Sequence, residues 1–334
     1  MSSETIIITH VDADGIGSSA LVIRSFGKRE EYIQNINILY IQPDEVYRTL
    51  QRVAKEIISK SVKNHIYITD LAPNKDRIND IRDILKRLIR EGKEVVWMDH
   101  HLWDDKWLDD LSSSGAKIIV DTSTCATGVV RKNLLPHDPF AIDLEKVICS
   151  IDLWKFDDPR ASFFTRLVSY KNTNEWRREL INKLITADKV EEVIEWGMKY
   201  IMDLVDKELY EYNYYLKKYS IKEICGVKFV ALVKEENSFI GTSQLGHYML
   251  SITNSDVAVI IRRNGSVSFR SREYNVRDLA VELGGGGHRL AAGASIKLDP
   301  LAKILVKLGF RKILINRVFD AINEVFEKKH ICKT

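Results

Sequence analysis

The stretch TIIITHVDADGIGSSAL, residues 5–21, decides the fold and raises a question of charge. A run of β-branched residues typical of a buried strand ends in His10, Asp12 and Asp14, with Gly15 directly behind them. Residues spaced by two on an extended backbone point the same way, and ligands bind at the carboxyl ends of parallel strands. Two carboxylates and an imidazole this close repel one another or need a cation. The alternative is a helix-capping turn, because Asp is common before a helix.

Length and composition describe an ordinary globular chain. It has 334 residues, enough for about two domains, with 45% hydrophobic and 29% charged residues. No apolar run approaches the roughly 20 residues of a membrane span, and the N-terminus has no secretory pattern, which predicts a cytoplasmic protein without a membrane partner. A net charge of +3 argues against a long, non-specific nucleic-acid tether but allows a short phosphorylated ligand.

The four cysteines are scattered along the chain. They form no CxxC pair, so the sequence predicts neither a disulfide framework nor a thiolate zinc site. The cysteines are Cys125, Cys149, Cys225 and Cys332.

Strand and helix patterns alternate over the first 150 residues, which predicts an α/β fold with a mostly parallel sheet. Apolar spacing of i, i+3, i+4 over 187–218 predicts a long connector helix, followed by a smaller α/β domain with a glycine-rich loop. The expected divisions are 1–186 for a catalytic, metal-binding domain, 187–222 for the connector and 223–334 for a substrate-binding domain. The expected strands are 5–9, 36–41, 65–69, 94–98, 117–120, 227–233, 257–263 and 266–271.

Two further strands end in acidic or imidazole side chains. YITDLAP places Asp70 at a strand end, and VVWMDHHLW places Asp99, His100 and His101 at another. Three strands ending this way at one sheet edge predict a metal site better than three independent helix caps. Mixed Asp and His donors without Cys suit Mn²⁺, Mg²⁺, Fe²⁺ or Zn²⁺, with Mn²⁺ the first choice. Five or more ligands exceed the needs of one ion, so two metals that share a carboxylate are expected.

A glycine run marks the second half of the chain. GGGGHRLAAGA, residues 284–294, would leave backbone amides bare for an anion, with the small residues after His288 opening a helix beside the ligand. A flexible linker is the alternative, but linkers are not followed by His-Arg and an Ala-rich turn. Upstream, Arg270 in SFRS is the arginine best placed to bind phosphate, because its planar fork suits bidentate contacts.

The chain resembles the DHH phosphoesterase superfamily with its DHH-associated C-terminal domain. Four motifs carry this resemblance and occur in the order of that family: DxDG, an isolated Asp at a strand end, the literal DHH, and GGGGH. The resemblance covers almost the whole chain and is to the RecJ-like and nano-RNase (oligoribonuclease/pAp phosphatase) branch. It implies two divalent metal ions, Mn²⁺ before Mg²⁺. The implied metal ligands are His10, Asp12, Asp14, Asp70, His100 and Asp152, with Asp157 as a substitute for the last.

The resemblance also implies roles around the metals. His101 would face the scissile phosphate, and Asp99 would support the histidine pair. The implied substrate-binding residues are Arg270, Ser271, Gly285, Gly286, Gly287 and His288.

The expected function is metal-dependent hydrolysis of phosphodiester bonds in short RNA, short DNA or nucleotides, in which a metal-bound hydroxide attacks phosphorus. The alternatives are a pAp phosphatase, a cyclic-dinucleotide phosphodiesterase, an inorganic pyrophosphatase or polyphosphatase, an editing module, and a RecJ- or Cdc45-like non-catalytic replication partner. Cleavage polarity and oligomeric state stay open, with a homodimer among the options.

Overall fold

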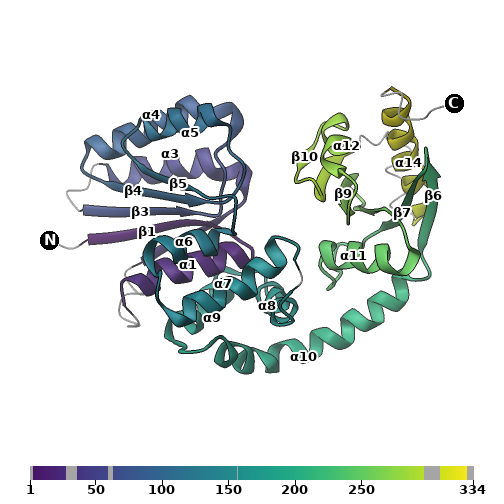
Figure 1. The fold of residues 1–334 in the computed structure, drawn as a ribbon, viewed down its shortest axis with the longest axis horizontal. Coiled ribbons are helices and arrows are strands. Elements are labelled where there is room, and N and C mark those ends of the chain that lie inside the picture. Colours follow the sequence, from purple (N-terminus) through teal and green to yellow (C-terminus); the bar gives the residue numbers. More distant parts are fainter. Residues whose placement is uncertain (1–2, 28–35, 59–62, 156, 297–308, 329–334) are drawn as a thin grey trace. The chain divides into compact units, whose positions relative to one another are not determined.

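The computed structural model describes residues 3–27, 36–58, 63–155, 157–296 and 309–328. The chain divides into two compact units, Met1–Met202 and Asp203–Thr334, each with its own sheet (Figure 1). The division falls inside the long helix α10, Val190–Tyr215, which lies where the sequence predicts a connector. The predicted domain limits at 186 and 222 stay a prediction.

The first unit is built on a five-stranded parallel sheet in the order β2-β1-β3-β4-β5, which confirms the predicted α/β class. β1 is an inner strand, paired with β2 on one side and β3 on the other, and its isoleucines are buried on both faces. The strands are β1 Ser3–His10, β2 Ile36–Ile41, β3 Lys63–Thr69, β4 Glu94–Asp99 and β5 Lys117–Val120.

Helices cover both faces of this sheet, and each layer buries its own apolar core. One layer holds α3 Val46–Ile57, α4 Ile78–Arg90 and α5 Asp105–Ser112, with the short 3₁₀ turns η1 Pro43–Glu45 and η2 Lys75–Arg77 preceding the first two. The other layer holds α1 Ala13–Ser25, α6 Ala126–Leu134, α7 Pro139–Asp152, α8 Arg160–Ser169 and α9 Asn174–Thr186.

The second unit has a six-stranded mixed sheet in the order β10-β11-β9-β8-β7-β6. Helix α11 packs on one face, and α12 and α14 pack on the other. The strands are β6 Tyr219–Ile224, β7 Val227–Val233, β8 Val257–Ile261, β9 Ser266–Ser271, β10 Gly286–Gly287 and β11 Ala291–Ser295; the helices are α11 Thr242–Thr253, α12 Val276–Glu282 and α14 Arg311–Lys328.

Two expectations are wrong. The small residues after His288 form the strand β11 and not a helix start, because their backbones pair with β9 on one side and β10 on the other. Cys125 and Cys149 form a disulfide bond, although the sequence predicts none. The two residues are 24 positions apart, and only the packing of α6 on α7 brings them together.

None of the described helices is long and apolar enough to cross a bilayer.

Candidate metal centre

The end of β1 and the start of α1 place the first three polar side chains. Asp12 is the N-cap of α1, and its Oδ1 accepts hydrogen bonds from the amides of Asp14 and Gly15, each at 3.1 Å. Its Oδ2 lies 2.9 Å from Nδ1 of His10. The predicted capping turn is therefore present, and the second carboxylate oxygen still faces the strand-end histidine, so the cation site stays a prediction.

Gly15 lets the chain turn this sharply. A Cβ atom built on Gly15 would lie 2.3 Å from the carbonyl oxygen of His10, well inside van der Waals contact. The same turn is tied to the sheet by Thr9, whose hydroxyl donates to the carbonyl of Gly15 at 2.8 Å and accepts from Thr69 at 2.9 Å. The turn therefore requires glycine at this position, because a side chain would collide with the backbone of His10. The turn keeps His10, at the end of β1, close to Asp14, in the first turn of α1.

Asp14 is buried and held by the N-terminus of α6. Its Oδ2 accepts from the amide of Ala126 at 2.7 Å, and its Oδ1 accepts from the amide and the hydroxyl of Thr127, both at 2.7 Å. Unpaired amides at a helix start favour a carboxylate. Sequence reasoning missed Thr127; the small residues CATG, 125–128, were the only signal that a helix begins against the site.

Asp70 follows β3 with a left-handed backbone, at φ 56°. This conformation is uncommon for a residue other than glycine and often marks a functional position. Its amide donates to the carbonyl of Met98 on β4 at 3.2 Å, and its side chain is almost fully buried. The next residue is fixed in turn, because the indole of Trp97 donates to the carbonyl of Leu71 at 2.8 Å. The neighbouring strand therefore holds Asp70 against the centre.

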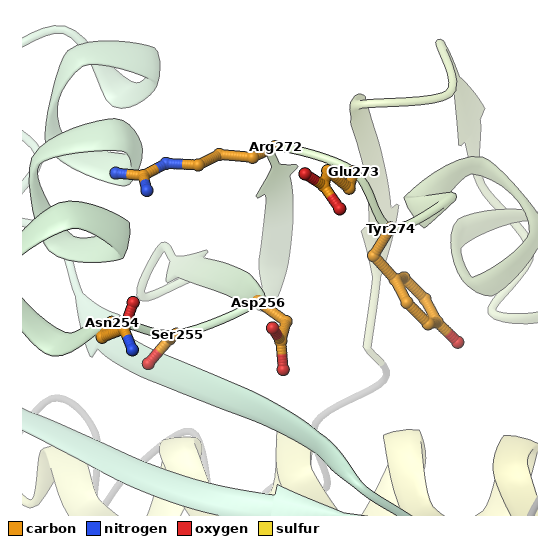
Figure 2. A pocket seen from close by; sticks show the side chains of 6 residues that line it. All are labelled: Asn254, Ser255, Asp256, Arg272, Glu273 and Tyr274. Atoms are coloured by element: carbon orange, nitrogen blue, oxygen red, sulfur yellow. The ribbon is translucent and has the colours of Figure 1, made fainter.

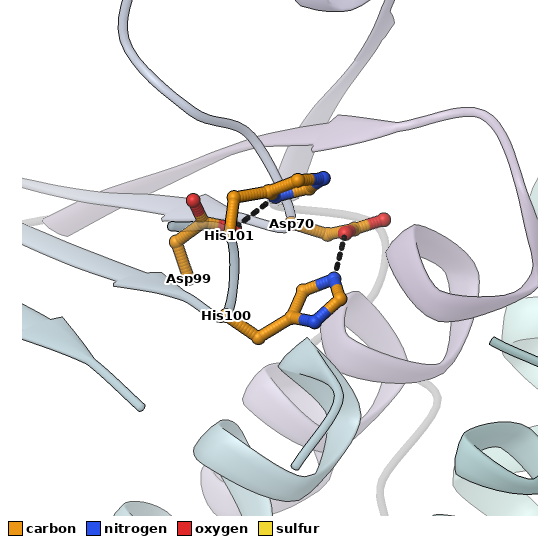
Figure 3. Close-up of side chains that lie close together, drawn as sticks. All are labelled: Asp70, Asp99, His100 and His101. Atoms are coloured by element: carbon orange, nitrogen blue, oxygen red, sulfur yellow. Dashed lines mark hydrogen bonds and ion pairs between the residues drawn. The ribbon is translucent and has the colours of Figure 1, made fainter. Parts of the chain in front are cut away.

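The DHH triplet at the end of β4 separates into two roles (Figure 3). Asp99 is fully buried, and its carboxylate lies 2.8 Å from Nδ1 of His101 and accepts from the indole of Trp103 at 2.7 Å. Asp99 therefore fixes the ring of His101. His100 points to the other side and lies 3.5 Å from Asp70.

Three carboxylates surround the ring of His100. Its Nε2 lies 3.6 Å from Asp14, 3.5 Å from Asp70 and 3.5 Å from Asp152 at the end of α7. Asp157, the predicted substitute for Asp152, is exposed. All six predicted metal ligands thus lie in one cluster, and Asp70 belongs both to a group with His10 and Asp12 and to one with Asp99, His100 and His101.

The electrostatics of this cluster call for positive charge. Burial raises the pKa of Asp70 well above its ordinary value, and the charges of Asp12 and Asp14 raise it further. Burial also raises the pKa of Asp152 well above its ordinary value, with the charges of Asp14 and Asp70 adding to it. Burial opposes protonation of His10, but its contacts with the carboxylates of Asp12 and Asp70 outweigh burial and raise its pKa to about 11. The carboxylates crowd one another, so a bound cation would stabilise them.

The donor atoms fit divalent metal ions. Oδ2 of Asp70 and Oδ2 of Asp152 are buried and accept no hydrogen bond from the described residues, which is unusual for a buried carboxylate without a ligand. In each of three groups the donor atoms lie within 4.8 Å of one another. Carboxylate oxygens and imidazoles suit Mn²⁺ or Mg²⁺. One group is His10, Asp12 and Asp70, another is Asp14, His100 and Asp152, and the third is Asp70, Asp99, His100 and His101.

The predicted substrate-binding residues lie in the second unit. Arg270 is on β9, opposite Ala291 of β11. Ser271 is buried, and its hydroxyl accepts from the amides of Glu273 and Tyr274, so it serves a turn.

The glycine run is separated from the strand of Arg270 by β11, and its amides are partly engaged by backbone hydrogen bonds. The amide of Gly285 donates to Ala280, and that of His288 donates to Ala291, each at 2.8 Å. A Cβ atom on Gly285 would lie 2.0 Å from the carbonyl oxygen of Gly293, so close strand approach already requires glycine there. The anion-binding role of Gly285, Gly286, Gly287 and His288 stays a prediction.

A pocket of about 480 Å³ lies elsewhere in this unit (Figure 2). It includes none of the predicted site residues. Its lining residues are Asn254, Ser255, Asp256, Arg272, Glu273 and Tyr274.

Comparison with known families and sequences gives consistent results. Residues 218–309 match the DHHA1 domain. The chain is 23% identical over 319 residues to the oligoribonuclease NrnB of Bacillus subtilis, covering 91% of this chain and 76% of that protein.

Solved structures give the same fold at low sequence identity. RecJ from Thermus thermophilus, solved in complex with Mn²⁺, matches with a TM-score of 0.56 and 14% identity over 96% of this chain and 52% of its own. An exopolyphosphatase-related protein of Bacteroides fragilis matches with a TM-score of 0.54 and 18% identity over 99% of this chain and 94% of its own.

Proposed function

Because the DHHA1 domain, the curated relative and the shared fold together support a DHH-superfamily phosphoesterase, we propose that the chain hydrolyses phosphodiester bonds of short oligonucleotides or nucleotides. The main support for this proposal is the buried cluster of acids and histidines, in which two carboxylate oxygens accept no hydrogen bond from the described residues. A cluster of this kind is costly to bury without a cation. Its position at the carboxyl ends of parallel strands is where substrates meet such folds.

The metal ligands would be His10, Asp12, Asp14, Asp70, His100 and Asp152, and both Asp70 and His100 belong to two of the three groups. Two divalent cations, Mn²⁺ before Mg²⁺, would lower the pKa of a bound water and neutralise charge on the phosphoryl oxygens. The Asp14 carboxylate, held by Ala126 and Thr127, would keep this part of the ligand set preorganised.

His101 would bind the scissile phosphate. Burial disfavours its protonation, but its hydrogen bond to Asp99 outweighs burial and raises the pKa of the imidazole. With Nδ1 bonded to Asp99, Nε2 is the nitrogen that would donate a proton or a hydrogen bond to a phosphate oxygen. Trp103 holds the second oxygen of Asp99, so the imidazole keeps its orientation when a charged phosphate approaches.

In the second unit, Arg270, the glycine loop and His288 would bind the nucleotide part of the substrate. Hydrogen bonds of Arg270 support this proposal. Its guanidinium donates to the hydroxyl of Ser243 on α11 and is therefore held on the face of β9 that this helix covers. A substrate class of short oligonucleotides agrees with the modest net charge of +3.

Cleavage of end-labelled substrates in the presence of Mn²⁺ tests the proposed function. A two- to five-nucleotide RNA, the matching DNA, a 24-mer, pAp, cyclic di-AMP and pyrophosphate are compared side by side. We expect mononucleotides to be released from the short oligomers and chelator to stop the reaction. Cleavage of only one of the other compounds would contradict the proposed substrate class and identify that compound as the substrate instead. These compounds are pAp, cyclic di-AMP and pyrophosphate.

Asp14→Asn is the site variant for this experiment, because it keeps the shape of the side chain and removes its charge. We expect a loss of at least about 100-fold in kcat/KM. Asp44→Asn, an exposed aspartate in η1, is the matched control and should retain turnover. Equal activity of the wild type and the Asp14→Asn variant with Mn²⁺ would contradict the metal-site proposal.

A further inference from the structure

Arg270 lies on the face of the second sheet that α11 covers. Val267, Phe269 and Ser271 alternate with it along β9 and are buried towards the opposite face. Its partners across the strands are Ala258 on β8 and Ala291 on β11, both small. Arg270 therefore extends between small neighbours and meets the helix.

Ser243, in the first turn of α11, holds the guanidinium. Nε and Nη2 of Arg270 donate to the Ser243 hydroxyl oxygen at 3.1 and 2.9 Å, and Nη1 donates to the carbonyl of Phe269 at 2.8 Å. These bonds use all three nitrogens and restrict rotation of the side chain. A hydroxyl has no charge, so Ser243 orients the guanidinium without neutralising it, as a carboxylate at this position would.

Gly246, one turn along α11, makes room for the stem of the arginine. A Cβ atom built on Gly246 would lie 2.9 Å from Cγ of Arg270 and 3.2 Å from its Cβ. Any larger residue would push the arginine stem away from the helix. The glycine and the serine therefore act on the same side chain from successive turns.

The surroundings carry positive potential. Burial lowers the pKa of Arg270 to about 10. The pKa of His247, also on α11, is lowered to about 4 by burial and by the charges of Arg270 and Arg272. A negatively charged group would be stabilised at this face.

We infer that Ser243 and Gly246 are positioning residues, which hold Arg270 as a charged anchor for a phosphate of the substrate other than the scissile one. This inference rests on the proposed function and names residues that the sequence motifs did not mark.

The chain supplies a matched control for Ser243. Arg272 on the same strand end donates from Nη2 to the hydroxyl of Ser251 on the same helix at 2.6 Å, and its side chain lines the pocket of Figure 2. Ser251→Ala therefore removes an arginine–serine bond of the same kind without touching Arg270.

The experiment measures binding of a fluorescently labelled dinucleotide with a 5′-phosphate to the full chain, in an Asp14→Asn background that prevents turnover. Ser243→Ala should weaken binding about tenfold, the size expected for a lost hydrogen bond to a charged group. Ser251→Ala should change it less than twofold, and Ser243→Thr, which keeps the hydroxyl, should stay near the parent. Gly246→Ala should weaken binding in the same direction as Ser243→Ala.

A double-mutant cycle shows whether Ser243 acts through Arg270. In an Arg270→Lys background, Ser243→Ala should have little further effect. Equal losses for Ser243→Ala and Ser251→Ala, or additive losses of Ser243→Ala and Arg270→Lys, would overturn the inference.

A second readout separates this inference from the proposed function. Hydrolysis of bis(p-nitrophenyl) phosphate with Mn²⁺, by the chain with Asp14 intact, tests the metal site without a second phosphate, and Ser243→Ala should lower hydrolysis of the dinucleotide far more than hydrolysis of this diester. If the Asp14→Asn parent binds no dinucleotide while the chain with Asp14 intact hydrolyses this diester, the inference fails and the phosphoesterase proposal stands. If the parent binds the dinucleotide but the chain with Asp14 intact hydrolyses neither substrate, the proposed function fails and the Ser243 comparison still decides the inference.

Discussion

At the scale of the residue, single atoms decide whether the cluster can exist. Asp12 divides its two carboxylate oxygens between the cap of α1 and His10. Asp99 divides its own between His101 and Trp103. Asp70 and Asp152 each keep one buried oxygen without a hydrogen bond from the described residues. Asp99 is therefore committed to positioning His101, whereas the buried oxygens of Asp70 and Asp152 are the ones that a cation would satisfy.

Gly15→Ala tests the turn behind β1. The added methyl group would lie 2.3 Å from the His10 carbonyl oxygen, which is main chain and cannot move aside alone. We expect a loss of about 1–3 kcal/mol in the free energy of unfolding, together with a loss of metal affinity, as for other overpacked sites. Denaturant unfolding and metal titration measure the two effects.

Gly286→Ala is the control for stability, because a Cβ atom there has nothing within 4 Å. It should cost far less in the free energy of unfolding. A Gly15→Ala variant as stable as wild type would show that the turn has room for a side chain.

At the scale of the element, helix α6 is as much part of the candidate site as the strands. Its first two amides bind the Asp14 carboxylate, and the Thr127 hydroxyl adds a third donor. A helix start favours negative charge by its unpaired amides and its dipole. The Cys125–Cys149 disulfide joins the N-cap of this helix to α7, three residues before Asp152. Two of the predicted ligands therefore depend on how these helices pack.

Thr127→Val tests this contribution. Valine keeps the β-branched shape and both backbone amides but removes the hydroxyl that donates to Asp14 at 2.7 Å. We expect affinity for Mn²⁺ to fall about tenfold or more, as when other outer partners of metal ligands are removed. Isothermal titration of the metal-free protein measures it.

Thr165→Val on α8 is the matched control, since it removes a hydroxyl that donates to the helix carbonyl of Ala161. Unchanged Mn²⁺ affinity in the Thr127→Val variant would mean that the backbone amides alone position Asp14.

At the scale of the whole molecule, the six predicted metal ligands belong to the first compact unit. The second unit contributes the DHHA1 domain match and the predicted substrate-binding residues. Metal binding and nucleotide binding should therefore stabilise different parts of the chain. A ligand that binds only the folded state raises stability by mass action.

Calorimetry of the metal-free chain tests this division. Adding Mn²⁺ at about 100 times its Kd should stabilise the first unit by about 2.7 kcal/mol and leave the transition of the second unit in place. Asp152→Asn should raise the stability of the metal-free first unit, because it removes a buried carboxylate whose pKa is raised by burial and by its neighbours, and should abolish most of the Mn²⁺ effect. A Mn²⁺ shift confined to the second unit would place the metal elsewhere.

The sequence by itself determined the sheet and its ligand-bearing edge. Short continuous runs rich in β-branched and apolar residues predict strands almost residue by residue, as for 36–41, 117–120 and 227–233. Side chains that end parallel strands meet at one edge whatever the rest of the fold does, so His10, Asp70 and His100 were predictable as neighbours.

Only the tertiary structure decided the partners that come from distant segments. Thr127 on Asp14, Ser243 on Arg270 and the disulfide between Cys125 and Cys149 depend on how helices pack, and helix packing leaves no local period in the sequence. The strand at Ala291–Ser295 was missed for the same reason. Small residues have weak strand preference, and pairing with β9 and β10 decides their conformation.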